Sequence, residues 1–157
     1  FHTPNALHIR EIDQRTALLM YRAGFQTIRL GLETASFTHR NQFDSKVTRN
    51  DFRRAVKNLQ EAGFKKSQVG AYLLVGTPEQ NFDSVRKSIK IVKESGITPV
   101  LAHYTPIPHT RMWSSAVKVS RYDLESDPLF SNNAVFPCRR NAFSWETLSA
   151  LKRFAAG

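Results

Sequence analysis

The stretch "EAGFKKSQVGAYLLVG", residues 61–76, decides the fold, and "RAGFQTIRLGLE", residues 22–33, nearly repeats it. In each stretch a polar segment closes on Ala-Gly-Phe, and an apolar run follows. Glycine is the residue that most readily adopts the left-handed conformation in which many helices end. Each stretch is therefore typical of a helix that ends and turns back into a strand.

The segment from Thr48 to Ala62 has the apolar periodicity of a helix, because its apolar side chains recur three and four positions apart. Thr48 and Asp51 have the spacing of a capping box at the start of this helix, and Gly63 follows its last turn. The apolar run at residues 69–75 then predicts a strand that is buried on both faces.

The same joint occurs at Gly24, Gly63 and Gly96, each time between a predicted helix and an apolar run. The spacings of 39 and 33 residues match the size of a β–α unit. Repeated crossovers of this kind build parallel strands, in either a barrel segment or an open doubly wound sheet. The helices are predicted at residues 13–23, 48–62 and 80–95, and the strands at residues 1–4, 27–32, 69–75 and 97–104.

We therefore predict an α/β fold, a partial (β/α) barrel of about four parallel strands with helices on its outer face. A closed eight-stranded barrel needs about 250 residues, so a chain of 157 residues holds roughly half of one. The sheet edges then need a cover, and two copies of the chain are expected to dimerise through them. Residues 1–119 are assigned to the barrel half, and residues 120–157 to an irregular extension that ends in a helix at about residues 144–155.

The chain is basic, with a formal net charge of +10. Its Lys and Arg residues are scattered along the predicted helices, which favours solvated helix faces over a nucleic-acid-binding surface. The sequence predicts no membrane span, and its start lacks the features of a signal peptide, which favours the cytoplasm. One cysteine, Cys138, excludes an internal disulfide and a metal site built from several cysteines of this chain. Because the first residue is Phe, we expect the chain to be part of a longer protein.

Catalytic and ligand-binding residues of parallel α/β folds lie mostly at the carboxyl ends of the strands. Glu33 directly follows the strand at residues 27–32, where its carboxylate would either accept hydrogen bonds from a ribose or favour the N-terminus of a helix. Gly76 ends the next strand, either to let the backbone approach a ligand or to make a tight turn. Four of the five histidines are candidate metal ligands, but they have no metal-ligand spacing and are expected to be solvated or core residues; they are His2, His8, His103 and His109.

Four motifs follow one another along the chain: "HTPNALHIREI" (2–12), "AGFQTIRLGLETAS" (23–36), "VGAYLLVGTPEQ" (69–80) and "LAHYTPIPHTRMW" (101–113). In this order and spacing they resemble the second half of a radical S-adenosylmethionine (SAM) core, over about residues 1–130. The branch that they resemble most is related to methylthiotransferases and the elongator-type catalytic subunit. Members of this branch often carry an upstream cobalamin-binding domain.

In that family a six-stranded partial barrel holds a [4Fe–4S] cluster on a Cys-x3-Cys-x2-Cys loop, and SAM binds to the remaining iron site. Reduction cleaves SAM to a 5′-deoxyadenosyl radical, which abstracts a hydrogen atom from the substrate. The resemblance implies that this chain is the SAM-binding half, and that residues outside it, in a missing N-terminal part of the same protein, hold the cluster. Alone, the chain should be inactive. Cobalamin would require the absent domain, and the substrate is unknown.

The resemblance also assigns SAM contacts to individual residues. Glu33 matches the residue that contacts the ribose, and Ser36 matches the polar residue near the methionyl group. Lys46 is the candidate that pairs with the SAM carboxylate, and it lies one position beyond the usual spacing from Glu33. Two segments match the walls beside the adenine: Leu74, Val75 and Gly76, and Tyr104, Thr105 and Pro106.

Two other functions stay open on the sequence. The chain could be a basic module that binds RNA, in which case its affinity for RNA should fall steeply with salt and should not need SAM. It could also be a non-redox α/β domain whose polar residues at the strand ends only form turns.

Overall fold

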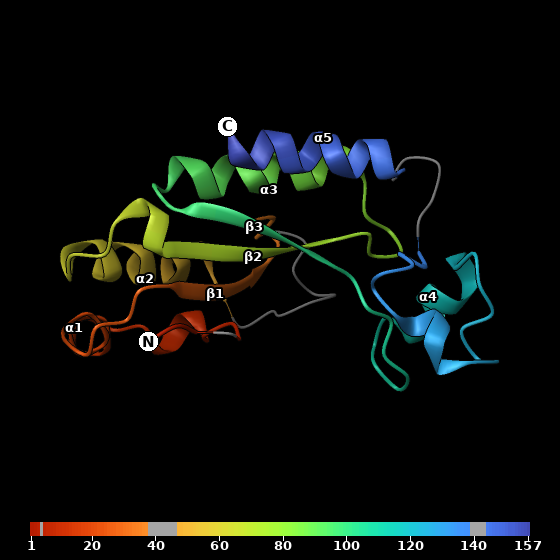
Figure 1. Ribbon diagram of the computed structural model, residues 1–157, viewed down its shortest axis with the longest axis horizontal. Coiled ribbons are helices and arrows are strands. Elements are labelled where there is room, and N and C mark those ends of the chain that lie inside the picture. Colours follow the sequence, from red (N-terminus) through yellow and green to blue (C-terminus); the bar gives the residue numbers. More distant parts are fainter. Residues whose placement is uncertain (4, 38–46, 139–143) are drawn as a thin grey trace.

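A parallel sheet forms the centre of the molecule (Figure 1). The computed structural model describes residues 1–3, 5–37, 47–138 and 144–157. Within them, the sheet has three strands in the order β1-β2-β3, each parallel to its neighbour. This arrangement confirms the predicted α/β fold. The strands are β1 (Ile28–Glu33), β2 (Val69–Val75) and β3 (Thr98–His103).

Of the strand predicted at residues 1–4, residues 1–3 are described and lie beside the start of β1, where the N-terminal segment makes isolated parallel bridges instead of a continuous ladder. The amide of Arg29 donates to the hydroxyl of Thr3 at 2.9 Å. Because a side chain takes the place of a backbone carbonyl here, the ladder between the two segments is interrupted. The bridges join His2 to Thr27 and Leu7 to Leu30.

The glycine joints have the predicted conformation. Each helix that leads into a strand ends just before a glycine with a left-handed φ. The capping box predicted from Thr48 and Asp51 is also present. The joints are α1 (Gln14–Arg22) with Gly24 at φ 78°, α2 (Arg49–Glu61) with Gly63 at φ 109°, and α3 (Phe82–Glu94) with Gly96 at φ 76°.

Helices α1, α2, α3 and α5 (Trp145–Ala156) share one core on one face of the sheet, which corresponds to the outer face of a partial barrel. Alternate residues of β2, such as Leu73 and Val75, are buried in one core with the apolar side chains of α2 and α3. Tyr72 and Leu74 point to the opposite, inner face and are only half-buried. The inner face of the sheet is therefore the side on which a ligand can reach the strands.

The C-terminal extension returns to the sheet. After β3 the chain forms α4 (Trp113–Val119), which the sequence analysis did not predict, and an irregular segment. The last helix, α5 (Trp145–Ala156), then packs against α3 and β3 (Figure 1). No helix in the described part of the chain is long and apolar enough to cross a membrane. Short 3₁₀ turns lie at Ile9–Glu11, Lys66–Gln68 and Pro128–Ser131.

Candidate functional site

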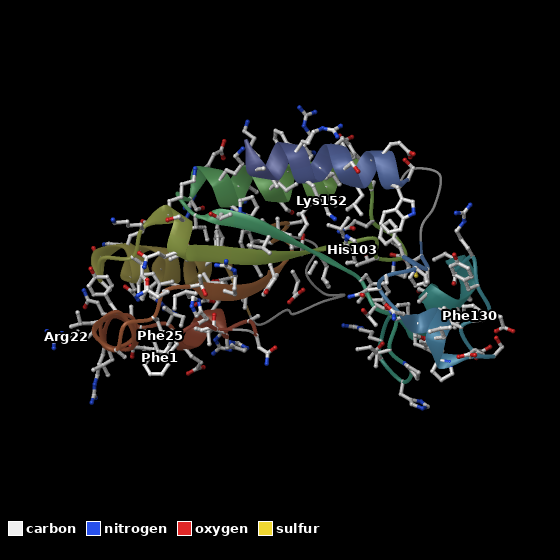
Figure 2. The ribbon with its side chains drawn as sticks, viewed as in Figure 1. Phe1, Arg22, Phe25, His103, Phe130 and Lys152 are labelled. Carbon is white, nitrogen blue, oxygen red and sulfur yellow. The ribbon has the colours of Figure 1, made fainter. Side chains whose placement is uncertain are left out.

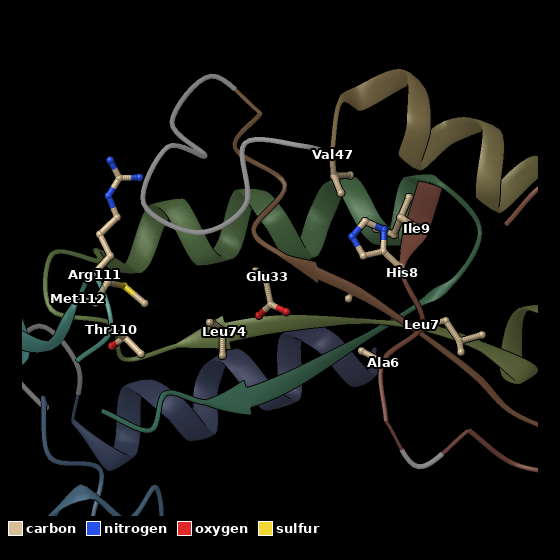
Figure 3. Close-up of a pocket in the computed structure, with 11 residues that line it drawn as sticks. Ala6, Leu7, His8, Ile9, Glu33, Val47, Leu74, Thr110, Arg111 and Met112 are labelled. Carbon is tan, nitrogen blue, oxygen red and sulfur yellow. The ribbon is translucent and has the colours of Figure 1, made fainter. Parts of the chain in front are cut away.

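A hollow of about 520 Å³ lies on the inner face, beside the carboxyl end of β1 (Figure 3). Its walls come from the N-terminal segment, from β1 and β2, and from the turn before α4. Its volume falls within the range of small-molecule sites, roughly 300–1,000 Å³. The lining includes the apolar residues Leu7, Ile9, Leu74 and Met112 and the charged residues Glu33 and Arg111.

The carboxylate of Glu33 lies in the middle of this hollow (Figure 3). The pairing of β1 with β2 shifts register between Gly31 and Glu33, and Glu33 has a φ of 61°. The amide of Thr34 donates to the carbonyl of Leu32 at 2.6 Å, which closes a three-residue turn around Glu33. The side chain reaches over Gly31, where an added Cβ would lie 3.8 Å from Oε1 of Glu33.

The backbone of Glu33 is strained. A left-handed conformation costs a residue that has a Cβ roughly 1–2 kcal/mol. Such residues persist only where their surroundings hold them, and they cluster at ligand-binding sites. The other role predicted for Glu33, a charge at a helix N-terminus, stays a prediction, because residues 38–46 lie outside the described residues. The strain therefore favours a role for Glu33 in binding.

Ser88 of α3 anchors the turn after Glu33. This serine is only 4% exposed. Its hydroxyl accepts a hydrogen bond from the amide of Ala35 at 3.1 Å and donates one to the carbonyl of Ser84 at 3.0 Å. The hydroxyl of Thr34 lies 3.4 Å away. Ser88 was not among the residues predicted from the sequence, although a serine on the apolar face of a predicted helix is a usable signal.

We expect Ser88→Ala to lower the free energy of unfolding by about 1–3 kcal/mol, because the amide of Ala35 would be left buried without a partner. Chemical denaturation would measure this loss. Ser84→Ala is the matched control, since Ser88 uses the backbone carbonyl of Ser84 and not its side chain. Equal losses in the two variants would contradict the anchoring role of Ser88.

The structure brings Glu33 and Leu74 together in the hollow, and it places the other described residues that were predicted to contact SAM outside the lining. Ser36 lies in the turn that follows Glu33, outside the described lining of the hollow. Val75 is fully buried in the core between the sheet and the helices. Lys46 lies outside the described residues. The assignment of these residues to SAM stays a prediction.

The end of β2 is covered by the extension. The amide of Gly76 donates to Oε1 of Gln80 at 2.7 Å, so this amide is already engaged. Gly76 also lies under the ring of Phe136, which would come within 2.0 Å of a Cβ added to the glycine. In this conformation Phe136 occupies the space through which a ligand would approach the backbone of Gly76.

The end of β3 is covered as well. Tyr104 lies in a second buried cluster, which includes Cys138. Burial raises the pKa of Tyr104 to about 12. Its hydroxyl has no hydrogen-bond partner among the described residues. Thr105 is half-buried and Pro106 is buried, and neither belongs to the described lining of the hollow.

Arg111 and Met112 are among the lining residues that were not singled out from the sequence. Both lie in the turn between β3 and α4, so the signal that could have found them is their position just past a strand end. Arg111 lines the hollow, and a guanidinium suits carboxylates and phosphates. Among the described residues, no group of three or more His, Cys, Asp or Glu side chains is arranged to hold a metal ion.

Comparison with known proteins gives a structural likeness only. No protein-family model and no curated protein matches the chain. The fold is similar to that of coproporphyrinogen III oxidase (HemN) from Escherichia coli, a radical SAM enzyme, with a TM-score of 0.59 and 17% sequence identity. The match covers 95% of this chain and 31% of the HemN chain. The chain therefore has the fold of part of a radical SAM partial barrel.

Proposed function

We propose that this chain is the SAM-binding half of a radical SAM iron–sulfur enzyme. The likeness to part of HemN supports the proposal at the level of the fold. The observation that carries it is the position of Glu33, a carboxylate held in a strained turn inside a largely apolar hollow. This hollow lies at the carboxyl end of a parallel strand, which is where ligands bind in folds of this type.

The described residues suit a ligand that contains a nucleoside. An ionised carboxylate such as that of Glu33 only accepts hydrogen bonds, and a ribose offers two hydroxyl donors. Leu7 and Leu74 supply an apolar wall, and Gly31 keeps the floor beneath Glu33 free of a side chain. The guanidinium of Arg111, which also lines the hollow, is suited to the carboxylate of SAM.

A [4Fe–4S] cluster does not fit the donors of this chain. Such clusters are held by several cysteine thiolates, and the sequence has a single cysteine. That residue, Cys138, is buried beside Tyr104 and is not part of the described lining of the hollow. The cluster, and any cobalamin, would be bound by a part of the protein outside this chain.

In this proposal the cofactor carries the difficult chemistry, because SAM bound beside a reduced cluster supplies a 5′-deoxyadenosyl radical. The residues of this chain bind and orient SAM. Glu33 accepts hydrogen bonds from the ribose and fixes its position, and Ser88 holds the turn that presents Glu33. The apolar wall excludes water from the space around the bound nucleoside.

Reconstitution of the full-length protein with iron and sulfide tests the proposal. Under anaerobic reducing conditions, the full-length protein should convert SAM to 5′-deoxyadenosine. This chain alone, treated in the same way, should form none because it has one cysteine. The upstream coding sequence should contain a Cys-x3-Cys-x2-Cys run. An intact cluster without 5′-deoxyadenosine formation would refute the proposal.

A further inference from the structure

The outer helix layer carries a basic hollow between α3 and α5. Its volume is about 520 Å³, and four basic residues of α3 line it, three of them exposed and Lys93 half-buried. One aromatic ring, that of Phe154 in α5, forms part of its wall and is 36% exposed. Figure 2 shows α3 and α5 side by side with side chains projecting from their outer surface. The cations are those of Arg86, Lys87, Lys90 and Lys93.

A second basic hollow, of about 300 Å³, lies on the other side of α3, next to α2. Glu94 lines both hollows, so they adjoin across the C-terminal end of α3. Seven basic and two acidic side chains line the pair, a sum of +5. Two of these cations lie near carboxylates: Lys90 is 3.7 Å from Glu94, and Lys57 is 3.6 Å from Glu61. The cations of the second hollow are those of Arg49, Arg53 and Lys57.

Several of these cations are held in place. The guanidinium of Arg86 and the ammonium of Lys93 each lie 5.3 Å from the centre of the Phe154 ring. Lys93 also donates a hydrogen bond to the carbonyl of Phe154 at 3.1 Å. Across α3, the guanidinium of Arg49 lies 5.5 Å from the centre of the Phe37 ring. A cation that is already positioned loses less side-chain entropy when it binds an anion.

We infer that this face binds single-stranded nucleic acid through its phosphates. A phosphate backbone needs a row of cations, whereas the core of a protein–protein interface is depleted of charged residues. A single strand is flexible enough to bend into two adjoining hollows. A duplex is stiff over about 150 base pairs, so it would pass over the hollows without entering them. The inference is independent of the proposed SAM site, because that site lies on the inner face of the sheet.

Fluorescence anisotropy of a labelled oligouridylate, with no SAM present, tests this surface. If about four phosphates are neutralised, the affinity should fall roughly 50-fold between about 50 and about 200 mM salt. Lys87→Gln/Lys90→Gln removes two exposed cations, so the same salt change should reduce its affinity only about 7-fold. The matched control, Arg15→Gln/Arg22→Gln, removes the same charge from exposed positions of α1 and should bind like the unaltered chain.

Three outcomes would overturn the inference. Equal weakening by the α1 control would show that only net charge attracts the strand. Equal or tighter binding of a duplex of the same length would show that the surface does not select a single strand. Binding of polyglutamate at the salt concentration at which oligouridylate fails to bind would assign the face to an acidic protein.

Discussion

Glu33→Gly in the full-length protein should weaken SAM binding by roughly 100-fold or more without destabilising the fold. The substitution removes the acceptor of two charge-assisted hydrogen bonds, each of which contributes about 1.5–3 kcal/mol. It also relieves backbone strain, because glycine adopts the φ of 61° that Glu33 has in the structure. Calorimetric titration with SAM would measure the affinity, and thermal unfolding would measure the stability.

Two further variants make this result specific. Glu33→Gln keeps the length of the side chain and one carbonyl acceptor, so it should bind SAM better than Glu33→Gly does. Glu125→Gln changes an exposed carboxylate in the extension and should leave the affinity unaltered. If Glu33→Gly gained stability and kept its affinity for SAM, Glu33 would be a turn residue with no part in binding.

The helices and strands of the sheet could be predicted because their signals are local. Each signal involves residues that are only a few positions apart. The signals are apolar periodicity, a capping box, and a glycine one turn past the last apolar residue. The segment from Thr48 to Val75 contains all three, and the structure has α2 and β2 there with nearly the predicted limits. The same reasoning failed for α4, which has seven residues and lies in a segment without clear periodicity.

The geometry of the site could be predicted only in part. Glu33 could be placed at a strand end from its position after an apolar run, but its left-handed turn depends on a register shift against β2. The contact between Ser88 and Ala35 joins residues 53 positions apart. Likewise, the extension brings Phe136 and Trp145 within 5.5 and 6.1 Å of the ring of His103. No local pattern in the sequence encodes contacts of this range.

A substitution at the end of β2, where the extension covers the strand, is expected to cause the largest loss of stability. Gly76→Ala should lower the free energy of unfolding by about 2–5 kcal/mol, from left-handed strain and from overpacking. The φ of Gly76 is 87°, and the new Cβ would lie 2.0 Å from Cε2 of Phe136. Phe136 is 1% exposed and packs against His103 and Trp145, so its ring has little room to move. Chemical denaturation of this chain would measure the loss.

Gly24→Ala separates the two causes, because Gly24 has a similar φ of 78° but nothing lies within 4 Å of an added Cβ. This control should lose only the strain, about 1–2 kcal/mol. Phe136→Ala makes room beside residue 76, so combining it with Gly76→Ala should cost about 1–3 kcal/mol less than the sum of the single variants. Equal losses at Gly24 and Gly76, with additive effects of Phe136→Ala, would show that the ring does not rest on the glycine. The space over Gly76 would then be free of the ring, although its amide would still donate to Gln80.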